Sequence, residues 1–234
     1  MNKKRVVVGL TAAAALVSAG FLNDAEASST ITSGTGWKAL IDHHIWKIDP
    51  SQNYTITFAS TSARSKTSTR FEAVVQQLRA KGLKISISTT IETVPAGSCA
   101  PKNHINVSLV YRPLNGQGGM SKAEPCYNTA NNSVWSSLIK MDSEYKQFGG
   151  TWYLSDTMFK NAFAHELGHA LGLEHPNTDL DHDGVVESGE CVKGSSGYKP
   201  QMCSPNRGAT PTNEIGKFGY YDLVGLTQLM KNYG

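Results

Sequence analysis

Three side chains are spaced so that they could act together on one metal ion: His165, Glu166 and His169. On a helix, residues four positions apart lie on the same face, so both imidazoles can bind the same ion. The carboxylate of Glu166 is adjacent and can reach a water molecule held there. The pattern predicts a metal-dependent hydrolytic site in which Glu166 is the general base.

Gly172 and His175 extend this pattern. A glycine tolerates a positive φ, so the chain can leave the helix at Gly172 and bring His175 back toward the first two imidazoles. Three neutral nitrogens leave the fourth position of a tetrahedral ion open, as in hydrolytic zinc sites. A bare H-E-x-x-H pattern occurs by chance on ordinary helices, and the added glycine and third histidine argue against coincidence. We therefore predict zinc as the ion.

A second metal motif follows in residues 179–190, which fit the pattern D-x-D-x-D-G-x5-E. Gly184 occupies the sixth position, where such calcium loops turn sharply. The predicted ligands are the side chains of Asp179, Asp181, Asp183, Glu187 and Glu190 and the backbone carbonyl of Val185. We expect Ca²⁺ to bind with a Kd of about 10⁻⁴–10⁻³ M, as in extracellular modules. The alternative is an acidic loop that is simply solvated.

The N-terminus resembles an export signal. Lys3, Lys4 and Arg5 precede an apolar run over residues 6–22, and small residues follow at 25–27. This order predicts a signal peptide at residues 1–27 and a secreted, extracellular protein. An uncleaved anchor is the alternative, although the run is short for a membrane span of about 20 apolar residues.

Export makes disulfides plausible for the four cysteines, Cys99, Cys126, Cys191 and Cys203. Four cysteines allow three pairings. We favour Cys99–Cys126 and Cys191–Cys203, because each pair closes a local loop. Four free thiols are the alternative.

Alternating and helical patterns place elements around these motifs. We expect strands at 54–59, 83–90, 103–111 and 134–141, a short edge strand within 113–133, a polar turn at 60–68 and a helix at 69–80. Ser155 or Asp156 can cap a helix that runs to about Leu171. This order predicts a mixed sheet with helices packed against it.

Composition limits the function classes. The chain has 234 residues, of which 39% are hydrophobic and 18% charged, so it is neither a disordered chain nor a membrane bundle. The 22 lysines and arginines are scattered against 19 acidic residues, which gives no basis for nucleic-acid binding. We expect a monomer with no stable membrane association.

The segment from His165 to His175 matches the H-E-x-x-H-x-x-G-x-x-H signature of the metzincin metallopeptidases and resembles their matrixin branch. The resemblance implies an α+β fold: a metzincin-like catalytic domain with a mixed twisted sheet, an active-site helix, a Met-turn and a C-terminal helix. Met202 matches the methionine of that turn, an apolar floor under the imidazoles. Residues 221–229 resemble the closing helix, from which Asp222 would hold the turn.

The resemblance implies a secreted zinc endopeptidase whose peptide substrate binds in extended form along an edge strand, which we expect within 118–123. Residues 28–45 would be a leader or short pro-segment, and residues 46–234 the catalytic domain with the calcium loop inserted at 179–190. His43 could approach the metal, and Tyr220 could contact the transition state, as a tyrosine does in some metzincins. We favour a surface position for His43 and core packing for Tyr220.

Two features depart from the family. Met202 follows His175 by 27 residues, and residues 28–98 contain no cysteine that could act as a latency switch. The alternative function is a secreted, non-catalytic binding protein stabilised by zinc and calcium. The presence of Glu166 argues against it, because a purely structural site needs no base.

Overall fold

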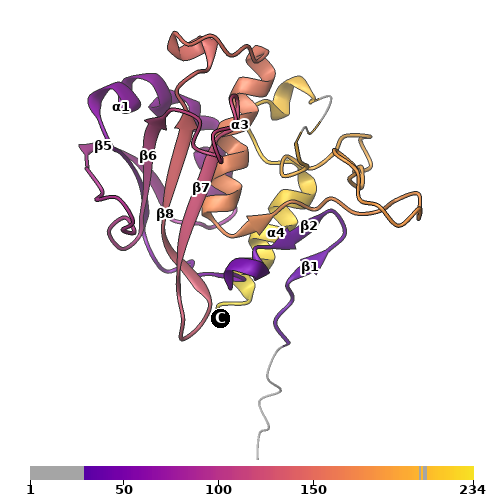
Figure 1. Ribbon diagram of the computed structural model, residues 1–234. Coiled ribbons are helices and arrows are strands. Elements are labelled where there is room, and N and C mark those ends of the chain that lie inside the picture. The colour runs from indigo at the N-terminus through magenta and orange to yellow at the C-terminus, as the bar shows by residue number, and fades with distance from the viewer. Residues whose placement is uncertain (1–28, 206, 208–209) are drawn as a thin grey trace, which may run out of the picture.

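A six-stranded, mostly parallel sheet forms the centre of the protein (Figure 1). The computed structural model describes residues 29–205, 207 and 210–234. The strands follow the order β3–β8–β6–β4–β5, and β7 pairs antiparallel with β8. Their bounds are β3 Lys47–Ile48, β4 Tyr54–Phe58, β5 Ile85–Ile91, β6 His104–Val110, β7 Lys122–Asn128 and β8 Ser133–Asp142. Among the described strands, β8 is the only partner of β7, so β7 presents a free edge.

Four α-helices accompany the sheet: α1 Thr61–Thr67, α2 Glu72–Ala80, α3 Asp156–Ala170 and α4 Tyr220–Lys231. The predicted mixed α/β organisation is confirmed, whereas the predicted polar turn at 60–68 is wrong. The Ser60 hydroxyl accepts a hydrogen bond from the Ala63 N–H and so caps α1. Ala63 and Thr67 are fully buried, and this tertiary packing stabilises a helix that its mostly polar sequence does not predict.

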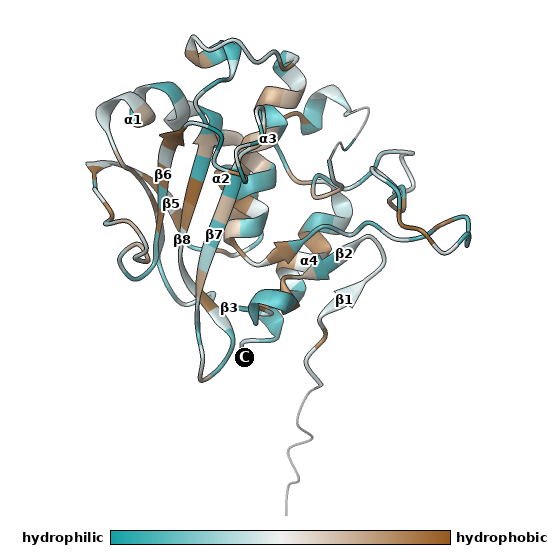
Figure 2. Cartoon of the chain, in the orientation of Figure 1, coloured by the Kyte–Doolittle hydropathy of each residue, from teal (hydrophilic) through white to brown (hydrophobic). Residues whose placement is uncertain are grey.

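The core lies between the sheet and helices α1–α3. The ring of Phe71, just before α2, meets the ring of Phe163 on α3 edge to face, with centroids 5.3 Å apart. Figure 2 shows hydrophobic residues concentrated along strands β6 and β8. Ile105, Val107 and Ile139 from these strands are buried in the same cluster. The helices are thereby fixed against the sheet, which gives α3 a rigid base.

A smaller antiparallel sheet joins β1 Ser33–Gly34, β2 Trp37–Ala39 and β9 Leu173–Glu174. The predicted signal peptide lies outside the described residues. Of the segment 28–45, which we expected to be a leader or short pro-segment, the described residues 29–45 contribute strands β1 and β2 and bury Trp37 and Ile45 in the core. Whether it is cleaved stays a prediction, but its second half is built into the fold.

Both favoured disulfides are present: Cys99–Cys126, with Cα atoms 6.1 Å apart, and Cys191–Cys203, with Cα atoms 6.0 Å apart. The first ties the segment after β5 to strand β7. Within the described part of the chain, no helix has the length and apolar character that crossing a membrane requires.

Candidate metal centre

Helix α3 presents the first two histidines. It begins at Asp156, where the Ser155 hydroxyl accepts a hydrogen bond of 3.2 Å from the Met158 N–H, and it ends at Ala170. His165 and His169 therefore lie one turn apart on the same face, as the four-residue spacing predicts.

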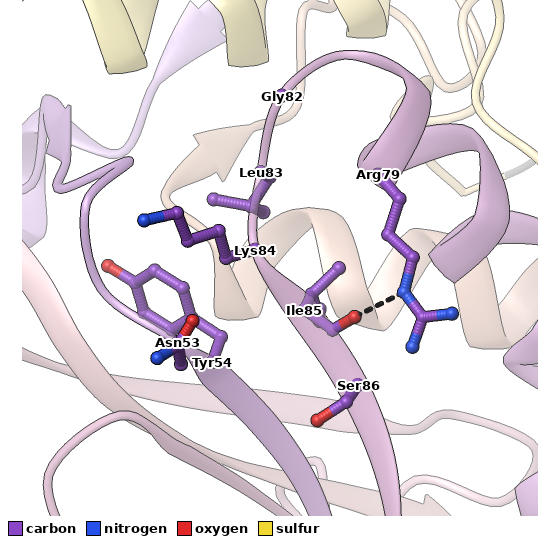
Figure 3. Close-up of a pocket in the computed structure, with 8 residues that line it drawn as sticks. All are labelled: Asn53, Tyr54, Arg79, Gly82, Leu83, Lys84, Ile85 and Ser86. Atoms are coloured by element: carbon purple, nitrogen blue, oxygen red, sulfur yellow. Dashed lines mark hydrogen bonds between the residues drawn. The ribbon is translucent and has the colours of Figure 1, made fainter.

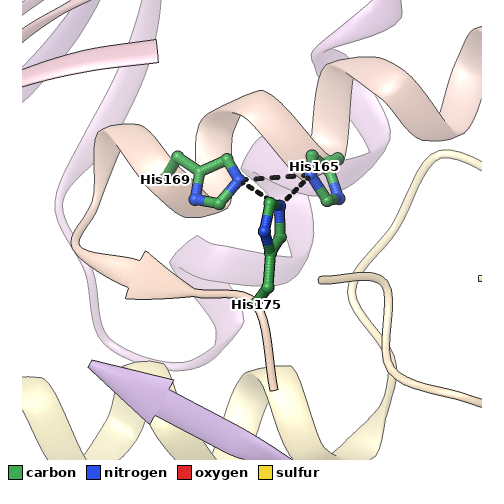
Figure 4. Close-up of side chains that lie close together, drawn as sticks. All are labelled: His165, His169 and His175. Carbon is green, nitrogen blue, oxygen red and sulfur yellow. Dashed lines mark hydrogen bonds between the residues drawn. The ribbon is translucent and has the colours of Figure 1, made fainter. Parts of the chain in front are cut away.

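The third histidine reaches the other two through a turn at Gly172. This glycine has a φ of +97°, and a Cβ there would lie 2.6 Å from Cγ2 of Ile45, so both conformation and space favour glycine. Strand β9 then carries the chain to His175. The Nε2 atom of His175 lies 3.2 Å from that of His165 and 2.9 Å from that of His169 (Figure 4). The Nε2 atoms of His165 and His169 are 3.2 Å apart.

Backbone carbonyls set the tautomer of two rings. Nδ1 of His165 lies 3.0 Å from the Gln201 carbonyl oxygen, and Nδ1 of His169 lies 2.8 Å from that of Leu173. A carbonyl can only accept, so each Nδ1 carries the proton and each Nε2 presents a lone pair to the centre. Burial, reinforced by the nearby His175, lowers the pKa of His165 to about 4. The rings are therefore neutral at physiological pH.

This donor set fits zinc. Zn–N distances of about 2.0–2.1 Å at tetrahedral angles separate the ligand nitrogens by about 3.3 Å, close to the spacing of the three Nε2 atoms. Lone pairs held this close repel one another unless a cation lies between them. Neutral imidazoles are borderline ligands that suit zinc and similar transition metals.

Glu166 lies beside the imidazoles and is 6% exposed. Its Oε2 atom is buried and has no hydrogen-bond partner within the described residues. Burial raises the pKa of the Glu166 carboxyl to about 8, and a cation at the imidazoles would lower it again. An orphaned carboxylate oxygen is costly unless it has a ligand or water to bind.

Met202 packs against the helix between the two histidines. A Cβ on Gly168 would lie 2.2 Å from the Met202 sulfur, so the absence of a side chain at Gly168 makes room for it. Asp222, on α4, accepts hydrogen bonds from the backbone N–H groups of Gln201 (2.7 Å), Met202 (3.1 Å) and Gly219 (2.8 Å). The turn under the imidazoles is thus held by a buried carboxylate.

A cavity of about 770 Å³ opens at the centre and is lined by all three histidines and Glu166. The segment 118–121 and the first half of β7 form one wall. Of the range 118–123, in which we expected the edge strand, only Lys122 and Ala123 belong to β7, so the strand begins later than predicted. Leu40 and His43 also line the cavity, so His43 is an exposed surface residue, as we interpreted it, and also lies at the cavity.

The acidic residues of 179–190 gather as the motif predicts. Carboxylate oxygens of Asp179, Asp181 and Glu190 lie within 4.8 Å of one another, as do those of Asp181, Asp183 and Glu187. The Asp179 carboxylate accepts from the Gly184 N–H at 2.9 Å, and Gly184 turns with a φ of +93°. A hydrogen bond with Glu190 raises the pKa of the Glu187 carboxyl.

This loop is tied to the turn that carries Met202. The Gly189 N–H donates to the Ser204 carbonyl at 2.7 Å, and the Asn177 side chain donates to the same oxygen, also at 2.7 Å. The Cys191–Cys203 disulfide adds a covalent link. In Figure 1 the segment containing the loop extends from the body of the molecule on the right. The loop segment and the turn that carries Met202 are therefore physically connected.

Some functional contacts have no signature in the sequence. The carbonyls of Leu173 and Gln201 orient imidazoles, yet any residue has a carbonyl. Arg207, whose side chain is buried, donates to the side-chain oxygen of Gln201 (3.2 Å) and pairs with Glu214. Tyr220 is 71% exposed and does not line the cavity, so our interpretation of it as core packing is wrong.

A second, shallower hollow of about 450 Å³ lies where α2 meets β4 and β5 (Figure 3). Arg79 and Lys84 line it, and the Arg79 Nε donates to the Ile85 carbonyl at 2.5 Å. It contains none of the predicted site residues, so the chemistry is concentrated in the larger cavity.

Comparison of the chain with models of known protein families finds no match, and comparison with curated protein sequences finds none either.

Proposed function

We propose that this chain is a secreted, zinc-dependent endopeptidase of the metzincin type, similar to the matrixin branch. The observation that carries the proposal is the convergence of three imidazole nitrogens beside the Oε2 atom of Glu166, which has no hydrogen-bond partner in the described part of the chain. Structural zinc sites are usually closed by four protein ligands, whereas hydrolytic sites keep one position open. Helix α3, the turn at Met202 and helix α4 follow one another in the order that the resemblance implies.

His165, His169 and His175 would hold the ion. Bound zinc would supply Lewis acidity and make a water molecule acidic near neutral pH. Glu166 accepts the proton of the attacking water and delivers it to the leaving amine. The carbonyls of Gln201 and Leu173 hold two of the rings in the binding tautomer, so those rings need little reorganisation when the ion arrives.

The free edge of β7 supports binding of an extended peptide substrate. Residues from Lys122 to Pro125 line the cavity, and their backbone groups can pair with an added strand. Antiparallel pairing is slightly more stable than parallel pairing. In that orientation the C-terminal half of the peptide lies beside Lys122 and the N-terminal half beside Pro125.

Calcium is the second ion of the proposal. Clustered carboxylates repel one another strongly without a cation, and oxygen donors at this spacing suit Ca²⁺. The bonds from Gly189 and Asn177 to Ser204 support a structural role, in which calcium stabilises the turn beneath the imidazoles.

Secretion is supported by the signal-like N-terminus and by two disulfides, which persist in oxidising compartments.

The test is Glu166→Gln, which preserves side-chain size and removes the base. The purified variant should keep zinc, measured by metal analysis, while peptide cleavage falls by about 10²–10⁴-fold. His175→Gln should instead weaken zinc binding itself. Equal hydrolysis by the wild type and Glu166→Gln would remove Glu166 from the mechanism. A wild type that binds zinc and cleaves no protein or peptide would favour the non-catalytic binding protein.

A further inference from the structure

Trp152 is an exposed aromatic residue at the rim of the cavity. Its side chain is 44% exposed although it lines the cavity, and Met120 and Met158, each 39% exposed, line the same region. Large apolar side chains that remain exposed beside a binding cavity mark a surface that a ligand covers.

The indole of Trp152 lies directly on the backbone of two glycines. A Cβ on Gly119 would lie 1.9 Å from the indole Nε1 atom, and a Cβ on Gly118 would lie 3.1 Å from the ring. No residue other than glycine therefore fits under the indole at position 119. Because the side chain is also partly exposed and lines the cavity, a ligand in the cavity can contact the ring.

We call the Trp152 indole and the Gly118–Gly119 backbone beneath it the platform, and hydrogen bonds hold both parts in place. The backbone N–H of Trp152 donates to the Glu144 carbonyl at 2.8 Å, and the Trp152 carbonyl accepts from the backbone N–H of Lys146 at 2.8 Å. Beneath it, the Gly119 N–H donates to the buried carboxylate of Asp142 at 2.6 Å. A preorganised aromatic surface loses little entropy when it binds a second ring.

The position of the platform along the cleft follows from two elements. Gly118 and Gly119 precede the Lys122 end of β7, the end that faces the C-terminal half of an antiparallel peptide. Met158 precedes His165 by seven residues on α3, a rise of about 10 Å, which is the length of about three residues of extended chain.

We propose that Trp152 is a specificity-determining residue, whose indole binds an aromatic side chain at the second or third position after the cleaved peptide bond. The inference rests on the proposed endopeptidase function and names its preferred substrates. Stacked or edge-to-face aromatic pairs gain stability beyond the area they bury.

The test compares fluorogenic peptides that carry Phe or Ala at those two positions. The ratio of kcat/KM for Phe peptides to that for Ala peptides should fall by about tenfold in Trp152→Ala, mainly through KM. Trp152→Phe should retain most of the ratio. Tyr153→Ala is the matched control, because Tyr153 is 71% exposed and does not line the cavity.

The outcomes separate the two proposals. An unchanged ratio in Trp152→Ala, with the wild type active and Glu166→Gln inactive, overturns the role of Trp152 and leaves the endopeptidase intact. A second peptide pair carries Phe or Ala before the cleaved bond instead, and a preference that changes only in this pair also overturns it, because the peptide would then run in the opposite direction. A wild type that cleaves no peptide overturns both.

Discussion

Replacing Asp222 by asparagine tests whether the turn at Met202 depends on a buried negative charge. One carboxylate oxygen, Oδ2, accepts from the N–H groups of Gln201 and Gly219, and Oδ1 accepts from that of Met202. An asparagine has one acceptor oxygen, which fits best where two donors meet. Its NH₂ group then faces the Met202 N–H, so one hydrogen bond is lost and two lose their charge.

The expected loss in the free energy of unfolding is about 2–4 kcal/mol, since a buried donor without a partner costs about 1–3 kcal/mol and charged bonds are about twice as strong as neutral ones. For a chain of this size the loss corresponds to a Tm lower by about 5–15 °C. Burial raises the pKa of Asp222 to about 6, so the comparison belongs well above that pH, where the carboxylate is charged.

Two assays are needed: thermal unfolding gives the change in Tm, and competition with a chromogenic chelator gives the zinc affinity of the folded protein. Zinc affinity should fall about tenfold, because the Gln201 carbonyl that orients His165 belongs to the same turn. Asp156→Asn is the matched control, an exposed carboxylate on α3 whose loss costs at most about 1 kcal/mol. If Asp222→Asn behaves like this control in both measurements, the carboxylate does not hold the turn.

Three further results are expected. Gly168→Ala should lower the free energy of unfolding by about 1–3 kcal/mol in chemical denaturation, since its Cβ would meet the Met202 sulfur at 2.2 Å. In a protein that already carries Met202→Ala, the same substitution should cost less. In protein stripped of metal, His165 binds its proton only near pH 4 when folded but near 6.5 when unfolded, so its contribution is complete above pH 6.5 and declines as the pH falls toward 4, by about 3 kcal/mol. When the free energy of unfolding is plotted against pH, the curves of the wild type and His165→Gln should converge as the pH falls across that range, and parallel curves would contradict the prediction. Calcium at 10–100 times its Kd should stabilise the zinc-loaded protein by about 1.4–2.7 kcal/mol, and a Tm that is independent of calcium, or equally dependent in Asp179→Asn, would refute the loop as its site.

Much of the metal centre could be predicted from the sequence because its geometry is local. Helical periodicity aligns His165 with His169, and Gly172 signals the turn that returns His175. The acidic loop is equally local, since one twelve-residue motif contains all its predicted ligands. Strands such as β4 and β6 could also be predicted, because large apolar residues alternate with polar ones along their sequences.

Other features depend on contacts between distant segments, which leave no local pattern. Helix α1 has few apolar residues and is stabilised where Ala63 and Thr67 meet the core. The carbonyl of Gln201 orients His165 from 36 residues away. The platform at Trp152 requires Gly119, a residue whose sequence context indicates only a flexible loop.

The N-terminal segment is linked to the metal centre through the third histidine. Strand β2 pairs with β9, aligning Lys38 with Glu174 and Ala39 with Leu173, and the Leu40 N–H donates to the Gly172 carbonyl at 2.8 Å. These bonds hold both ends of the short stretch that carries the Leu173 carbonyl to His169 and then reaches His175. Since α3 ends at Ala170, pairing with β2 helps the turn at Gly172 to hold His175 in place. Residues 38–40 therefore act as part of the proposed catalytic architecture, and their removal would free the third ligand from the other two.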